Sequence, residues 1–315
     1  MRAAVWLCAA ATLAQDPAFR TTTNLVVAPV TVTGRDGKPV DGLTAADFEL
    51  FDNGKKQPFD ADGFIPPIAL IAAIQTGASA AAASTKIRRV GAMFGPLVAG
   101  DRGQAAVITY DAEVRVAQPF TRDMARVANA VGDIAPRSPG GKMLDAVELA
   151  IRMFREGPKD HRRVLLLMGE SKDRGSAAKL ADTATEAQKE NVLIYSIAYS
   201  PFLTPFAVKQ QEIPKSPGGA NMNLIAIFEE IGRLGKENAA DLLVHHSGGR
   251  RLGFLKQKAL EKAVTAIGEE LHAQYLLGFT PPPGSREGHH SLVVRVKSRP
   301  DAVVRARPGY WLAAP

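Results

Sequence analysis

The chain has 315 residues, of which 46% are hydrophobic and 23% charged, and these ordinary globular values exclude disorder along its whole length. The 39 Lys and Arg residues outnumber the 32 Asp and Glu residues, so the formal net charge of +7 permits an acidic partner without requiring one. The single cysteine, Cys8, excludes a disulfide scaffold and a cysteine-based zinc site. The length predicts about two domains.

The first 14 residues have the pattern of a secretory signal peptide. Arg2 precedes an apolar run from Ala3 to Ala14 that only Thr12 interrupts. This run is too short to span a bilayer, and no later run approaches the 18 apolar residues of a membrane span. We predict a signal peptide at 1–14 and export to the periplasm or the cell exterior, with a frayed N-terminal helix as the alternative.

Residues 22–62 read as the first half of a small β module. Val26, Ala28 and Val30 alternate with neighbours of the other face, which is the period of a strand. Residues 36–37 and 53–54 are Asp-Gly and Asn-Gly turn signals, and residues 44–47 suit a short capped helical turn before a strand at 48–51.

Residues 64–272 alternate between strands and helices. The run 68–74 is continuously apolar, as expected for a strand buried on both faces. We expect strands at 68–74, 105–110, 114–120, 164–168, 192–198 and 251–254. Apolar residues at helical spacing predict helices at 87–97, 124–134 (capped by Thr121), 144–154, 176–190, 223–234, 237–247 and 260–271. This order predicts a doubly wound, mostly parallel sheet of Rossmann type, covered by helices on both faces.

Residues 273–313 return to β structure. A strand at 274–279 stops at three prolines, and residues 292–297 and 304–307 then alternate in polarity. Neither terminal β segment can bury a core alone. We therefore expect the two segments to pair and form one discontinuous module around the α/β domain.

Three stretches resemble the von Willebrand factor A (VWA) fold, and specifically the VWFA-related family of secreted bacterial proteins. They are residues 33–40 and 43–54 (TGRDGKPV, LTAADFELFDNG), residues 101–103 and 120–123 (DRG, FTRD), and residues 273–280 and 307–310 (AQYLLGFT, RPGY). The resemblance covers residues 22–312. It implies a VWA-like α/β domain used for adhesion or protein binding and not for catalysis.

The resemblance also implies a metal-ion-dependent adhesion site for Mg²⁺, but this sequence departs from the ligand pattern. Gln75, Gly77 and Ser79 stand where the family has Asp-x-Ser-x-Ser, so only the last ligand remains. Lys142 stands where the family has Thr, and Glu170 where it has Asp. Repulsion between an ammonium and a dication at about 4 Å is about 8 kcal/mol at an effective dielectric near 20, so we expect no cofactor. We hypothesise that Lys142 pairs with Glu170; the alternatives are a solvated Lys142 and a retained metal.

Two further features could contact a partner. The long loop after the strand at 192–198 carries Phe202, Leu203, Phe206 and Ile213 at the edge where α/β sheets bind ligands, or else packs them on its own domain. The C-terminal strands predict a basic face of Arg295, Lys297, Arg305 and Arg307, which either attracts an acidic partner or is the solvated side of a sheet.

Catalytic motifs are weak. Ser176 and Lys179 match Ser-x-x-Lys without its companion motifs, so we expect Ser176 to cap a helix. The six histidines include two adjacent pairs whose spacing forms no chelate, and we expect structural or solvated roles for them. No aromatic residues interleave with the basic ones, which argues against nucleic-acid binding.

The sequence thus predicts a secreted, non-enzymatic, metal-independent VWA-like module that binds an unknown protein partner. A structural or assembly protein of the cell envelope is the second interpretation, and an unrecognised hydrolase the third. Neither the partner nor the oligomeric state follows from the sequence.

Overall fold

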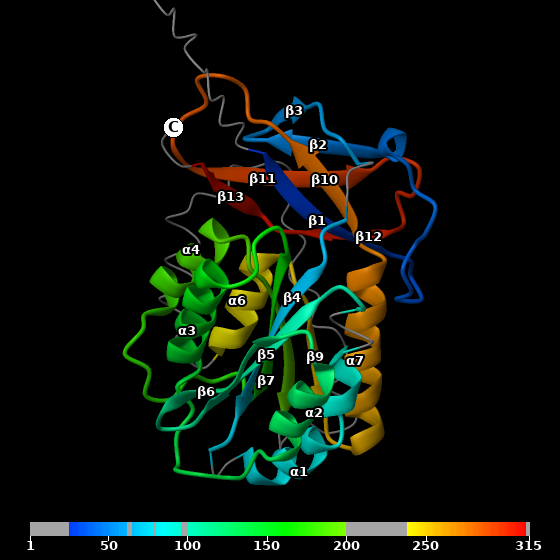
Figure 1. Ribbon diagram of the computed structural model, residues 1–315. Helices are drawn as coiled ribbons and strands as arrows, with labels where there is room; N and C mark the ends of the chain where they lie inside the picture. The colour runs from blue at the N-terminus through cyan, green and yellow to red at the C-terminus, as the bar shows by residue number, and fades with distance from the viewer. Residues whose placement is uncertain (1–24, 62–64, 78–79, 96–99, 200–237, 313–315) are drawn as a thin grey trace, which may run out of the picture.

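The computed structural model describes residues 25–61, 65–77, 80–95, 100–199 and 238–312. It divides into an α/β part, built around a six-stranded sheet, and a β module made of two small antiparallel sheets (Figure 1). Within these residues, no helix is both long and apolar enough to cross a membrane.

The six-stranded sheet has the order β6-β5-β4-β7-β8-β9. Its strands are β4 (Ile68–Gln75), β5 (Gln104–Tyr110), β6 (Val114–Thr121), β7 (Arg162–Gly169), β8 (Leu193–Tyr199) and β9 (Arg251–Phe254). All pairings are parallel except that of β6 with β5. All eight residues of β4 are buried, because the strand is central and covered on both faces, as its apolar run predicts.

Helices cover both faces of this sheet, as the alternation of elements predicts. One apolar core joins the sheet to α1 (Ala81–Arg88), the 3-10 turn η3 (Gly91–Met93), α2 (Met124–Gly132) and α7 (Gln257–His272). The other joins it to α3 (Met143–Glu156), α4 (Leu180–Lys189) and α6 (Ala239–Ser247). The fold is therefore a doubly wound α/β layer structure.

The β module combines the two ends of the chain, as predicted. One sheet has the order β10-β1-β12 and the other β13-β11-β2-β3. The strands are β1 (Val26–Thr33), β2 (Phe48–Asp52), β3 (Lys55–Gln57), β10 (Tyr275–Phe279), β11 (Gly288–Val296), β12 (Val303–Ala306) and β13 (Gly309–Leu312), with the 3-10 turn η1 (Ala45–Asp47) before β2. The alternating residues Val26, Ala28 and Val30 are all buried in the core between the sheets. Strand β13 was not predicted.

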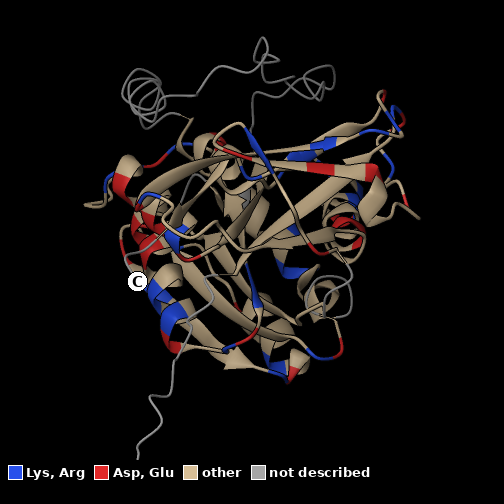
Figure 2. Cartoon of the chain, turned by 90° about the horizontal axis from the view of Figure 1, so that it is seen from above, with Lys and Arg blue, Asp and Glu red and all other residues tan. Residues whose placement is uncertain are grey.

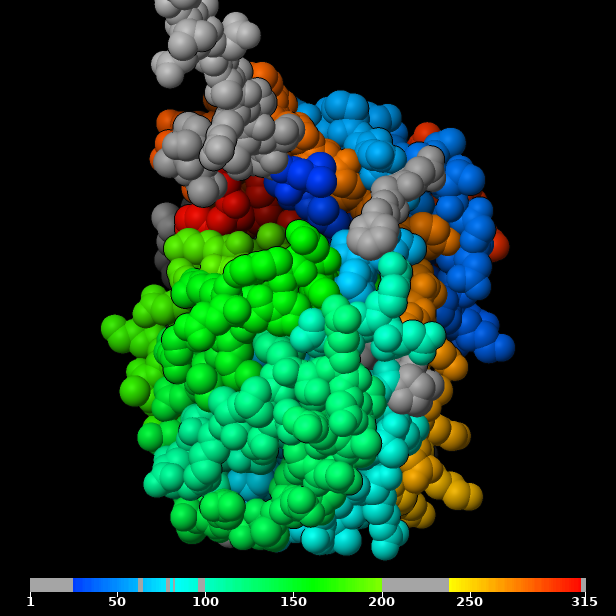
Figure 3. Space-filling model, viewed as in Figure 1, coloured from blue at the N-terminus to red at the C-terminus, as the bar shows by residue number. Residues whose placement is uncertain are grey.

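A buried carboxylate joins the β module to the α/β part. Glu270 of α7 is 2% exposed and accepts a hydrogen bond of 2.6 Å from the Tyr195 hydroxyl of β8. Its ion pairs are with Arg305 of β12 and, at 3.6 Å, with Arg250. Thr31 of β1 lies 3.5 Å from the same carboxylate. Figure 3 shows the blue and red segments of the β module resting directly on the green segments of the α/β part.

Three details of the helices differ from the prediction. The helix predicted at 87–97 is wrong, because α1 spans Ala81–Arg88 and the separate 3-10 turn η3 follows it. Helix α4 begins at Leu180 and not at 176, because the Ser176 hydroxyl donates to Asp173 at 2.6 Å and accepts from the Asp145 backbone N–H at 3.1 Å. Helix α2 is capped by Asp123, whose carboxylate accepts from the backbone N–H groups of residues 125 and 126, and not by Thr121. The helix predicted at 223–234 lies outside the described residues.

We expect Glu270→Gln to lower the free energy of unfolding by about 3 kcal/mol, because it leaves the partly buried guanidinium groups of Arg250 and Arg305 without a counterion. Urea unfolding followed by circular dichroism measures this loss. The neighbouring Glu269 is exposed, so Glu269→Gln is the matched control and should change stability by less than about 0.5 kcal/mol. Equal losses in the two variants would contradict a joining role for Glu270.

Candidate functional site

The candidate site lies at the carboxyl edge of the six-stranded sheet. Strand β4 pairs with β5 on one side and β7 on the other, so the direction of winding reverses at β4. Ligands of open α/β sheets bind outside the carboxyl ends of the strands at this reversal. In Figure 1 this edge is at the lower end of the molecule, away from the β module. Gln75 ends β4, and Glu170 follows β7 directly.

The Gln75 amide connects the segments that meet at this edge. Its carbonyl oxygen accepts a 2.7 Å hydrogen bond from the backbone N–H of Glu170. Its Nε2 lies 3.4 Å from the carbonyl oxygen of Gly140 and 3.4 Å from the Glu170 carboxylate. Gln75 is 1% exposed, so this amide fills the position where the family resemblance expects a metal-binding carboxylate.

Glycines let the backbone approach this amide closely. A Cβ at Gly77 would lie 2.3 Å from the Gly140 carbonyl oxygen, so no serine fits there without a backbone shift. A Cβ at Gly169 would lie 2.6 Å from the Gln75 Oε1 and 2.6 Å from the Tyr110 hydroxyl. Gly140 itself has φ +145°, which side chains rarely adopt. The first-motif position Ser79 lies outside the described residues.

The predicted pair between Lys142 and Glu170 is wrong. The Lys142 ammonium lies 3.9 Å from the carboxylate of Asp145, and Glu170 pairs with Arg174 at 3.3 Å. Lys142 is the N-cap residue of α3, so the carboxylate three residues further along the helix is within its reach. The Arg174 backbone also exchanges hydrogen bonds with Gly141, which holds the 170–174 loop against the start of α3.

Two buried aspartates that the sequence did not single out fix the surrounding loops. Asp111 accepts hydrogen bonds from the hydroxyl of Thr76 at 2.8 Å and from Arg115 at 3.1 Å. Burial raises the pKa of Asp111, but the backbone N–H of Glu113, Thr76 and Arg115 outweigh it and hold the pKa below its ordinary value. Asp173 accepts from the backbone N–H of Leu144 at 3.0 Å and so caps α3 from another segment. In the sequence, the pattern that could have identified both residues is an aspartate within a few positions of the end of a buried strand, β5 for Asp111 and β7 for Asp173.

This arrangement does not fit Mg²⁺. Magnesium prefers oxygen ligands in octahedral geometry, whereas Gln75 turns an amide nitrogen towards Glu170 and Gly140. The carboxylates of Asp111, Glu170 and Asp173 are each engaged by N–H or O–H donors. Among the described residues, no group of three or more His, Cys, Asp or Glu side chains is arranged to hold a metal ion.

The predicted basic face is also wrong. Arg295 and Lys297 of β11 are exposed, but Arg305 and Arg307 turn towards the α/β part, where Arg305 pairs with Glu270 and Arg307 is 5% exposed. Strands β11 and β12 lie in different sheets, so their residues do not share a face. Seen from above the β module, Lys and Arg are interspersed with Asp and Glu (Figure 2).

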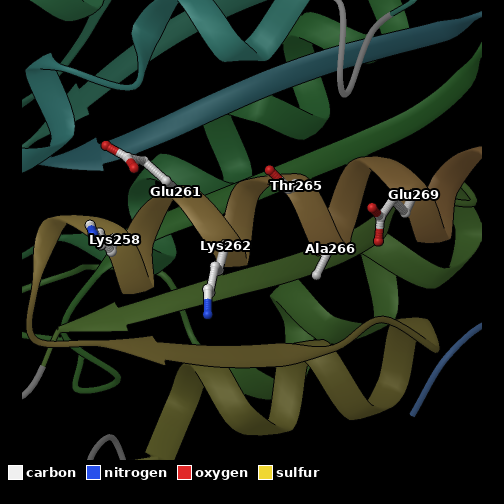
Figure 4. A pocket seen from close by; sticks show the side chains of 6 residues that line it. All are labelled: Lys258, Glu261, Lys262, Thr265, Ala266 and Glu269. Atoms are coloured by element: carbon white, nitrogen blue, oxygen red, sulfur yellow. The ribbon is translucent and has the colours of Figure 1, made fainter. Parts of the chain in front are cut away.

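The other predicted contact, the loop with Phe202, Leu203, Phe206 and Ile213, lies outside the described residues. A hollow of about 470 Å³ over α7 is lined by Lys258, Glu261, Lys262, Thr265, Ala266 and Glu269 (Figure 4). All six come from one helix, and both charge signs alternate along it. The hollow is therefore a solvated helix face and not a built site.

Four histidines are structural. His290 is buried: its Nδ1 lies 2.9 Å from Asp52 and 3.0 Å from the Asn53 side-chain nitrogen, and its Nε2 lies 2.6 Å from the carbonyl oxygen of Arg286. His289 packs against the Trp311 ring, with 5.8 Å between centroids. Burial lowers the pKa of His245, and it lowers the pKa of His246 to about 4, with His245 and His289 contributing. The histidine pair 245–246 of α6 and the histidine pair 289–290 of β11 thus lie close together, at the junction of α6 and the β module.

The strand order and the helices on both faces define a VWA-like fold of the doubly wound α/β class. Comparisons with protein-family models and with curated proteins find no match. Among solved structures, the chain is similar to an aerotolerance-related membrane protein from Bacteroides fragilis (13% identity over 65% of this chain and 98% of that chain, TM-score 0.47). It is also similar to BatB from Bacteroides thetaiotaomicron, with 14% identity over 65% of this chain and 98% of that chain and a TM-score of 0.46. A third similar structure is von Willebrand factor type A from Catenulispora acidiphila, with 12% identity over 84% of this chain and 73% of that chain and a TM-score of 0.47. The strand order, and not these scores, defines the class.

We expect Gly77→Ala to lower the free energy of unfolding by about 2 kcal/mol, because the new Cβ would meet the Gly140 carbonyl oxygen. Urea unfolding tests this. Gly132, at the end of α2, has no atom within 4 Å of the place that a Cβ would occupy, so Gly132→Ala is the control and should be neutral or stabilising by about 0.5 kcal/mol. A Gly77→Ala protein as stable as that control would refute the close packing.

We expect the protein to lose about 2 kcal/mol of stability through His246 between pH 7 and pH 5. The folded-state pKa of about 4 lies below the ordinary 6.5, so the unfolded chain binds the proton more readily. The contribution of His246 to the free energy of unfolding is therefore complete above pH 6.5 and is lost as the pH falls towards 4. Urea unfolding at both pH values should show a smaller loss in His246→Gln, and an unchanged loss in the exposed control His272→Gln. An equal loss in His246→Gln would contradict the assignment.

Proposed function

We propose that this protein is a secreted, non-enzymatic VWA-like module that binds another protein at the carboxyl edge of its sheet without a metal ion. The observation that supports this most directly is the Gln75 amide, which bonds to Glu170 and approaches Gly140 where a metal-binding carboxylate is expected. The edge is held together by the chain's own hydrogen bonds, so a metal is not needed to order it.

Basic side chains surround this edge. Arg137 is exposed and is anchored through its backbone N–H to the Thr76 carbonyl oxygen at 2.9 Å. The Arg174 side chain is 50% exposed and that of Lys142 34%. Surface ion pairs contribute about 0–1 kcal/mol, so the pairs of Lys142 and Arg174 can be exchanged for carboxylates of a partner. Protein-borne cations would then take over the attraction for a partner's carboxylate that the family assigns to Mg²⁺.

The polar groups near this edge support a binding role more than a catalytic one. Ser176, the predicted Ser-x-x-Lys serine, is committed to Asp173 and to the backbone of Asp145. Asp111, with its lowered pKa, is an ionised acceptor surrounded by donors and is poorly suited to take up a proton at neutral pH. These groups hold loops in place, which a binding surface requires.

The proposal is tested by capture from envelope extracts with chemical cross-linking, with EDTA and with Mg²⁺. We expect the same partner to be captured in equal amounts with EDTA and with Mg²⁺. We also expect calorimetric titration of the protein with Mg²⁺ to show no saturable binding. The double variant Lys142→Glu, Arg174→Glu should reduce capture about tenfold or more, because it reverses the charge that faces an acidic partner.

The matched control is Arg295→Glu, Lys297→Glu, which makes the same charge change on the exposed face of β11. It should leave capture unchanged. Saturable Mg²⁺ binding or capture that EDTA abolishes would overturn metal independence. Equal losses in both double variants would overturn the placement at the carboxyl edge, and self-association without a partner would favour the envelope-assembly interpretation.

A further inference from the structure

A second site is a cavity of about 320 Å³ between the β module and the α/β part, at the opposite end of the sheet from the edge described above. Strand β1 contributes Val27 and Pro29, Leu25 lies directly before it, and the starts of β7 and β8 contribute Val164 and Leu193. Leu25 is 62% exposed, so the cavity reaches the surface beside it. The volume suits a small ligand, and these walls are apolar.

Two guanidinium groups line this cavity without a carboxylate partner among the described residues. Arg162 donates to the side-chain oxygen of Gln274 at 3.1 Å and to the carbonyl oxygen of Leu271 at 3.0 Å. Arg307 donates to the side-chain oxygen of Asn191 and to the carbonyl oxygen of Val27 at 2.9 Å. Every acceptor is neutral. The Nε–H of each guanidinium is buried and has no partner within the described chain.

The third arginine of the lining shows the contrast. Arg163 pairs with the carboxylate of Glu190, which also pairs with Arg155. The lining holds three arginines against the two carboxylates of Asp160 and Glu190, so positive charge exceeds negative charge by one around the cavity. Burial lowers the pKa of Arg162, and it lowers the pKa of Arg307 to about 10. A buried charge without a counterion is unfavourable, so this cavity attracts an anion.

We propose that the cavity binds a small organic anion, with a carboxylate near Arg162 and Arg307 and an aliphatic portion against Val164, Leu193 and the β1 residues. Guanidinium groups suit a carboxylate because they present several N–H donors in one plane. Ligand binding at this seam would stabilise the junction of the two parts. This inference is independent of the protein-binding role proposed for the carboxyl edge.

Hexanoate is the probe, because it joins a carboxylate to a short aliphatic chain. We expect saturable binding by calorimetry and a rise in Tm of about 3 °C at about ten times its Kd. Hexylammonium, with the same chain and the opposite charge, should do neither. An equal response to hexylammonium, or no response to hexanoate at millimolar concentrations, would overturn the proposal. Phosphate or sulfate acting as strongly as hexanoate would overturn the organic part of the assignment.

The decisive variant is Asn191→Asp, which supplies an internal carboxylate to Arg307 with little change in shape. Asn191 has φ 54°, a conformation that Asp also tolerates, so the fold should survive. We expect a higher Tm without ligand and hexanoate binding weakened about tenfold. The same charge change at exposed Asn129 of α2 is the control and should leave binding unchanged. Unaltered hexanoate binding by Asn191→Asp would contradict the role of Arg307.

Discussion

The buried carboxylate of Glu270 is the interaction on which the arrangement of the molecule depends. It is contacted by β1, β8 and β12, so the β module and the α/β part cannot separate without exposing or orphaning a charge that is 2% exposed. Gln274, at the start of β10, extends this network by donating to Thr31 and Tyr195, at 3.2 Å each. The network fixes the β module over the amino end of the six-stranded sheet. As a consequence, the carboxyl edge remains uncovered by it.

At that edge the chain uses an amide where the resemblance expects an acid. A carboxylate at position 75 could not donate to Glu170, and it would add negative charge beside it. The amide instead accepts from the Glu170 backbone with one end and presents its N–H groups to Glu170 and Gly140 with the other. Gly77 and Gly169 make room for this contact. The amide at position 75 and the close packing of the loops thus belong to one arrangement, centred on Gln75.

Much of the fold followed from local patterns, because burial leaves a period in the sequence. The apolar run of β4 and the alternation of β1 each predicted what the strand buries. The errors arose where partners are distant in sequence. Alternation shows which residues of β12 share a face, but it cannot show that β12 joins β1 and not β11, so Arg305 was placed in solvent. The pairing of Lys142 failed for a similar reason, since the path of the 170–174 loop decides which carboxylate each cation meets.

The excess of basic residues also acquires a different meaning. Four arginines, Arg162, Arg250, Arg305 and Arg307, lie at the seam between the two parts, and Glu270 pairs with two of them. A net charge of +7 would be easily accommodated if all the basic residues lay on the surface. Here, however, some of that positive charge is buried, as at Arg307. Packing alone does not require arginine at positions that contact only neutral acceptors, since an apolar side chain would avoid the desolvation of the charge. The retention of two such guanidinium groups beside one cavity is what makes an anionic ligand the most direct explanation of this seam.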